Sequence, residues 1–138
     1  MKAIILGATG AVGRDLVRQL LQDDNFTELS LLVRRIPEGL SSPKLKIQVL
    51  DFDQPDQWPE LPEADVLFSC LGTTLRDAGS QAAQYRVDYG YQYEVARRAA
   101  ARGVPHYVLV SAWGAKASSR SFYTRMKGEL ESAVQVLP

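Results

Sequence analysis

The stretch Gly7-Ala8-Thr9-Gly10-Ala11-Val12-Gly13 decides the fold of this 138-residue chain. An apolar run at residues 3–6 precedes it and predicts a buried strand, and apolar residues recur at helical spacing over 10–22. In such a strand–turn–helix unit the first glycine permits a tight turn, the second lets a pyrophosphate approach the backbone, and the third lets the helix lie close to the sheet. An ordinary strand-to-helix turn is the alternative. The predicted cofactor-binding residues of this turn are Gly7, Thr9, Gly10, Ala11, Val12 and Gly13.

Short apolar runs alternate with helical patterns along the rest of the chain. The further predicted strands are 29–33, 47–50, 65–70 and 107–111, and the further predicted helices are 81–102 and 122–136. Strands that alternate with helices imply right-handed crossovers and a parallel sheet with helices on both faces. The connection between the second and third strands is a polar loop with Gly, Ser and Pro, which disfavours a full helix. We predict a doubly wound α/β domain, the Rossmann fold, with strand order 3-2-1-4-5.

The composition predicts a soluble domain and excludes several classes of site. Sixteen basic residues balance sixteen acidic ones, which argues against binding to nucleic acid as the main activity. The single cysteine, Cys70, excludes a disulfide framework and a Cys-rich zinc site, and we predict no metal site. The sequence contains neither an apolar run of about 18 residues nor a secretory signal pattern. We therefore expect a cytoplasmic protein that makes no membrane contact.

The second predicted strand ends in Arg34 and Arg35. In a dinucleotide-binding domain this position contacts the adenosine ribose, and a carboxylate there favours NAD. No acidic residue occurs here before Glu38. Two guanidinium groups suit the 2′-phosphate of NADP, because arginine offers planar, bidentate donors. We predict NADP(H) rather than NAD(H), and a solvated basic strand end is the alternative.

Two further segments follow predicted strands at the edge where open α/β sheets bind ligands. Asp51 follows the third strand, where its carboxylate can accept a hydrogen bond from the adenine amino group, although it could equally form a turn. Leu71, Gly72 and Thr73 follow the fourth strand, and Gly72 suits a close approach of the cofactor. We include all four residues among the predicted cofactor contacts.

The last predicted helix carries Tyr123 and Lys127, which are four residues apart and therefore share one face. A neighbouring cation favours the phenolate form of a tyrosine, which suits a general acid/base for a carbonyl oxygen. Lys127 can also bind the nicotinamide ribose. Ser111 ends the fifth predicted strand and completes the catalytic set by holding the substrate oxygen, and Trp113 is close enough to wall the substrate site. An exposed Tyr/Lys pair on an amphipathic helix is the alternative.

The glycine turn and the Y-x-x-x-K helix occur together in the atypical and extended short-chain dehydrogenase/reductases, which this chain resembles over essentially its whole length. The stretches Leu71-Gly72-Thr73-Thr74 and Lys127-Gly128-Glu129 make it similar to the Tat-interacting oxidoreductase-like branch, also described as nucleoside-diphosphate-sugar epimerase-like. The resemblance implies that the three glycines bind the pyrophosphate and that the two arginines bind the 2′-phosphate. It also implies that Tyr123 is the general acid/base of a catalytic set with Ser111 and Lys127.

Together these features predict an enzyme, an NADP(H)-dependent oxidoreductase that transfers hydride to or from a small carbonyl or hydroxyl substrate. A non-catalytic NADP(H)-binding sensor or protein-interaction module is the alternative. Tyr85, Tyr89 and Tyr93 form a stripe on the long helix that favours packing and is a candidate homodimer face. Because a complete fold of this type has a sixth strand, we expect residues 1–138 to be one NAD(P)-binding domain that lacks its C-terminal strand and substrate lobe.

Overall fold

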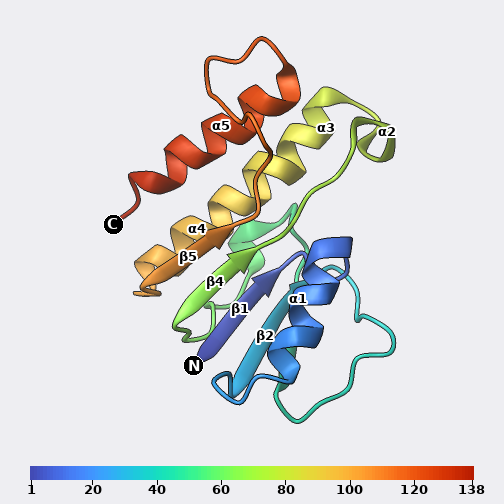
Figure 1. Ribbon diagram of the computed structural model, residues 1–138, viewed down its shortest axis with the longest axis vertical. Helices are drawn as coiled ribbons and strands as arrows, with labels where there is room; N and C mark the ends of the chain where they lie inside the picture. The colour runs from blue at the N-terminus through green and yellow to red at the C-terminus, as the bar shows by residue number, and fades with distance from the viewer.

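The computed structural model describes residues 1–138 and contains one five-stranded parallel sheet (Figure 1). The strands lie in the order β3-β2-β1-β4-β5, and every neighbouring pair is parallel. This order confirms the predicted Rossmann-like α/β fold. The strands are β1 (Lys2–Leu6), β2 (Glu28–Val33), β3 (Leu45–Val49), β4 (Val66–Ser69) and β5 (His106–Leu109).

Helices cover both faces of the sheet. Helix α1 (Ala11–Leu21) packs on one face and α4 (Gln92–Ala101) on the other, and Figure 1 shows α1 in front of the sheet and α4 behind it. None of the helices combines the length and the apolar character that crossing a membrane requires. The remaining elements are the 3₁₀ turn η1 (Pro55–Gln57), α2 (Leu75–Ala78), α3 (Gln81–Tyr85), the π-helical segment η2 (Arg86–Tyr91) and α5 (Phe122–Gln135).

Strand β1 lies at the centre of the sheet and is buried on both faces. Because side chains alternate along a strand, Ala3 and Ile5 join the core under α1, whereas Ile4 and Leu6 join the core under α4. Ile4, Ile5 and Leu6 are each 0% exposed. This apolar strand supplies the fixed platform from which the glycine turn leaves the sheet.

The structure changes the predicted elements in two places that matter for the site. The predicted helix 81–102 is a continuous run of α3, η2 and α4, so it contains a π-helical segment that the sequence pattern did not predict. The predicted fifth strand is too long: β5 ends at Leu109, and Ser111 lies beyond it in the loop before α5. The expected absence of a full helix between β2 and β3 is confirmed.

Candidate functional site

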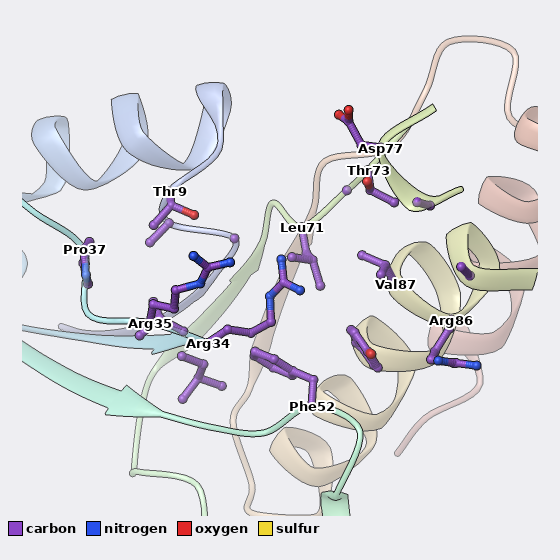
Figure 2. A pocket seen from close by; sticks show the side chains of 18 of the residues that line it. Thr9, Arg34, Arg35, Pro37, Phe52, Leu71, Thr73, Asp77, Arg86 and Val87 are labelled. Carbon is purple, nitrogen blue, oxygen red and sulfur yellow. The ribbon is translucent and has the colours of Figure 1, made fainter. Parts of the chain in front are cut away.

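A cavity of about 570 Å³ opens at the carboxyl ends of β1, β2 and β4 (Figure 2). This is the edge at which open α/β sheets bind their ligands. The wall is formed by the glycine turn, the end of β2, the segment after β3, the segment after β4, and the helical run from α2 to η2. Lining residues include Gly7, Ala8, Thr9, Arg34, Arg35, Phe52, Leu71, Gly72, Thr73, Asp77, Val87 and Tyr91.

Two glycines of the first turn are required by the packing of the protein itself. Gly7 has a φ of +85°, and a Cβ atom there would lie 2.5 Å from the carbonyl carbon of Cys70. A Cβ atom on Gly13 would lie 1.9 Å from the carbonyl oxygen of Gly7. Each of these distances is shorter than any real Cβ contact, so the turn, α1 and the end of β4 meet through backbone alone. This confirms the predicted close packing of the helix at Gly13.

Gly10 differs from its two partners. A Cβ atom there would meet only the Gly7 carbonyl oxygen, at an ordinary 3.6 Å. Gly10 is the N-cap of α1, no side chain caps this helix start, and its first turn contains no acidic residue. The N–H groups at this end of α1 therefore face no competing protein anion, which is the condition that favours a phosphate group.

Arg34 and Arg35 leave the end of β2 and extend toward the cavity between the glycine turn and Leu71 (Figure 2). Both side chains are exposed, and neither takes part in any of the ion pairs of the structure. The site therefore presents two cations without a protein counter-ion. An anionic group of a ligand could meet both.

The structure places Asp51 in a turn, which was the alternative to an adenine contact. Its carboxylate accepts a hydrogen bond from the backbone N–H of Asp53 at 3.0 Å, and it does not line the cavity. Phe52 forms the wall at this place, with its ring stacked on that of Tyr91 at 5.4 Å. Burial and the hydrogen bond that its hydroxyl donates to Asp53 raise the pKa of Tyr91 to about 12.

Tyr123 and Lys127 lie together in the first half of α5, whereas Ser111 lies in the loop between β5 and α5, and none of the three lines the cavity. The Nζ atom of Lys127 lies 5.7 Å from the ring centroid of Tyr123, whose side chain is 42% exposed. The hydroxyl of Ser111 is buried and has no hydrogen-bond partner. Trp113 is 99% exposed, so the expectation that it walls the substrate site is wrong in this structure.

Sequence analysis missed the residue that holds Lys127. Asp88, in η2, is fully buried, and its Oδ1 atom lies 2.9 Å from the Nζ atom of Lys127. Its Oδ2 atom accepts a hydrogen bond from the backbone N–H of Thr73 at 3.3 Å. The available signal was a single carboxylate on the apolar side of a helix, which is unusual unless it is paired.

Comparison with a family model described as NAD(P)H-binding gives a match over residues 7–135. Among curated proteins, the chain is 37% identical over 142 residues to "Protein FMP52-1, mitochondrial" of Scheffersomyces stipitis, covering 99% of this chain and 62% of that protein. It is 34% identical over 139 residues to "Protein fmp52, mitochondrial" of Emericella nidulans, covering 96% and 60%. The chain thus spans about 60% of the length of these relatives.

Solved structures resemble the chain in fold. The oxidoreductase ylbE from Lactococcus lactis gives a TM-score of 0.74 at 19% identity and covers 99% of this chain and 64% of its own. A UDP-glucose 4-epimerase from Thermotoga maritima, solved with UDP-glucose, gives a TM-score of 0.77 at 12% identity and covers 99% and 51%. At these identities the likeness establishes the Rossmann-like fold alone.

The names of the relatives overturn the predicted cytoplasmic location, because both proteins are named as mitochondrial. The prediction rested on the absence of a secretory signal and of a membrane-spanning run. Those features bear on secretion and membrane insertion, and they carry no information about import into an organelle.

Proposed function

Because the chain belongs to the NAD(P)H-binding family, we propose that it is an NADP(H)-dependent oxidoreductase of the short-chain dehydrogenase type. Its reaction moves a hydride between the nicotinamide and the carbon of a small carbonyl or hydroxyl substrate. The Tat-interacting oxidoreductase-like branch remains a prediction within this proposal, since the relatives carry only the FMP52 name.

The observation that carries the proposal is that two guanidinium groups, those of Arg34 and Arg35, line the cavity without a protein counter-ion. A carboxylate at this strand end would repel a 2′-phosphate, whereas two arginines can bind it through charge-assisted hydrogen bonds. The same cavity begins at the glycine turn, where Gly10 leaves space beside the free N–H groups of α1. These residues fit a dinucleotide whose adenosine ribose is phosphorylated.

The catalytic part of the proposal rests on Ser111, Tyr123 and Lys127. In the direction of reduction, the carbonyl carbon receives the hydride while the Tyr123 hydroxyl gives its proton to the carbonyl oxygen. The orphaned hydroxyl of Ser111 is a donor with no protein partner, which suits it to hold that oxygen. Lys127 places its positive charge over the Tyr123 ring, where it stabilises the phenolate that forms.

The alternative of a non-catalytic NADP(H)-binding module also has an observation in its favour. Lys127 is already paired with Asp88, and neither Lys127 nor Tyr123 lines the cavity. The two proposals share the cofactor and differ in the role of Tyr123.

The test has two stages. Fluorescence titration of the wild-type chain with NADPH and with NADH should give a lower Kd for NADPH, and equal values would contradict the cofactor assignment. A reductase screen over small aldehydes and ketones then compares wild type with Tyr123→Phe. For an enzyme the variant should lose on the order of 10²–10⁴-fold in turnover and keep its NADPH affinity. If no substrate is turned over although NADPH binds tightly, the non-catalytic module is favoured.

A further inference from the structure

We propose that Asp88 is a positioning residue. Its carboxylate holds the Lys127 ammonium and the backbone of Thr73 in fixed positions relative to each other, and it so couples the cofactor cavity to Tyr123 and Lys127. The inference deepens the proposed function and rests on it for the role of Lys127. Asp88 does not line the cavity, and it takes no part in the chemical step itself.

The two oxygens of Asp88 face different parts of the site. Oδ1 lies 2.9 Å from the Nζ atom of Lys127, on α5, and Oδ2 accepts from the backbone N–H of Thr73, which lines the cavity. Asp88 is 0% and Lys127 is 3% exposed. A single carboxylate therefore joins two segments that lie more than fifty residues apart in the sequence, and a displacement of either segment changes both contacts.

The π-helical segment η2 gives the carboxylate its place. Asp88 lies in the middle of η2, and π-helical turns within α-helices occur frequently at functional sites. Gln92, also 0% exposed, donates one hydrogen bond to the Asp88 carbonyl at 2.9 Å and another to the Leu71 carbonyl at 2.8 Å. These bonds tie η2 to the segment after β4 and fix the backbone from which the Asp88 side chain extends.

Gly72 supports the same assignment independently. A Cβ atom at Gly72 would lie 3.1 Å from Asp88 Oδ1, so a side chain there would press on the oxygen that binds Lys127. Gly72 also lines the cavity. Because residue 72 is a glycine, it has no side chain that would press on Asp88 Oδ1 from the cavity.

Pairing with Asp88 leaves Lys127 able to act on a ligand. An ammonium group has three donors, and the Asp88 contact uses one of them. The other donors have no acceptor in the structure, so they are available to the ribose hydroxyls of a ligand that reaches this side chain, which is 3% exposed and does not line the cavity. Removal of the carboxylate leaves a buried charge without its counter-ion, and such a group moves or loses its proton. The positioning role therefore predicts a defect in cofactor binding that arises through Lys127.

The experiment uses the full chain with ¹⁵N-lysine labelling, and it follows the Lys127 ammonium signal by NMR, assigned by its loss in Lys127→Met. In wild type the buried, paired group should exchange slowly with water and give a sharp signal that shifts when NADPH is added. In Asp88→Asn the signal should disappear or move, and the Kd for NADPH should rise roughly tenfold, as for the loss of a contact within one network. The matched control is Glu94→Gln, which removes a carboxylate paired with arginines on α4 outside the cavity and should change neither readout.

A Lys127 signal that is unchanged in Asp88→Asn, or an NADPH affinity within about twofold of wild type, would overturn the inference. If Asp88→Asn does not fold, Gly72→Ala takes its place, because its methyl group displaces the carboxylate by only a few tenths of an ångström; it should shift the Lys127 signal and weaken NADPH binding. An unchanged signal in that variant also refutes the proposal. A wild-type chain that binds neither NADPH nor NADH refutes the proposed function instead, and in that case the Lys127 signal alone decides whether Asp88 anchors this side chain.

Discussion

Replacement of Arg34 and Arg35 by alanine should convert a chain that prefers NADPH into one that binds both cofactors alike. The two guanidiniums extend toward the cavity and have no protein counter-ion, so their removal leaves no buried partner unsatisfied. The fold should tolerate both changes. The effect should therefore fall on the ligand, and only on the ligand that carries a 2′-phosphate.

The magnitude follows from the exposure of the two side chains. A charge-assisted hydrogen bond contributes about 1.5–3 kcal/mol when it is shielded from water, but exposed ion pairs contribute less than about 1 kcal/mol. Both arginines are exposed, and a dianionic phosphate is a stronger partner than a carboxylate, so we assign about 1 kcal/mol to each. Each single variant should then weaken NADPH binding about fivefold, and the double variant about thirtyfold.

The assay is a titration of wild type, both single variants and the double variant with NADPH and NADH at low and high salt. The Kd for NADH should stay within about twofold throughout, because NADH lacks the phosphate. The preference of wild type should shrink at high salt, since screening weakens exposed charge pairs. Arg18→Ala is the matched control, because it removes an exposed arginine of α1 that does not line the cavity. A double variant that keeps the wild-type ratio of the two Kd values would refute the assignment of the 2′-phosphate site.

Three further predictions concern stability and are read from urea denaturation. Gly13→Ala should lower the free energy of unfolding by about 3 kcal/mol or more, because its methyl group meets backbone that cannot move aside. Gly10→Ala should lower it by less than about 1 kcal/mol and should weaken NADPH binding. Equal losses of stability would contradict the separate roles of these glycines. Lys127→Met should lower the free energy of unfolding by about 3 kcal/mol, because it leaves a buried carboxylate without a partner, and adding Asp88→Asn should recover most of that loss. A double variant whose loss equals the sum of the two single losses would argue against the pairing. Burial and the hydrogen bond to Glu129 raise the pKa of Tyr85 to about 12, above the value of about 10 for the unfolded chain. The unfolded state therefore loses this proton first, so stability should fall as the pH rises from about 10 to about 12, and Tyr85→Phe should flatten the fall.

The arrangement of the strands was predictable because its signals are local. Each predicted run is four to six residues long, and the first three are followed directly by Gly7, Arg34 and Asp51, which mark the ends of these strands locally. The glycine turn was predictable for the same reason, because the steric needs of Gly7 and Gly13 arise within the first strand–turn–helix unit and its neighbouring strand. The end of the fifth strand was placed too late: β5 ends at Leu109, and beyond it only the N–H of Val110 bonds to β4, at the carbonyl of Ser69.

The parts of the site that escaped prediction depend on distant partners. Asp88 and Lys127 are 39 residues apart, so the sequence could mark the aspartate as an unusual carboxylate on the apolar side of a helix but could not identify its partner. The π-helical segment differs from an α-helix by less than one residue per turn over six residues, which the spacing of apolar side chains cannot resolve. Trp113 was expected to wall the substrate site because it closely follows Ser111, but in the structure it is exposed to solvent.

In the proposed cofactor site, the residues that would choose between NADP and NAD lie at the start of the connection between β2 and β3, which has no helix, apart from the glycine turn that would bind the pyrophosphate. Arg34 and Arg35 stand at the start of this loop, whereas the glycine turn is locked between β1, α1 and the end of β4. The sheet aligns β3 through five residue pairs with β2, and doubling the length of a surface loop costs only about 0.6 kcal/mol. Exchanges of the exposed Arg34 and Arg35 therefore leave the sheet intact, whereas a side chain at Gly7 or Gly13 disturbs the turn and the elements packed against it. Under the proposed function, a change of preference between the two nicotinamide nucleotides during evolution would therefore leave the glycine turn, which would bind the part that both nucleotides share, unaltered.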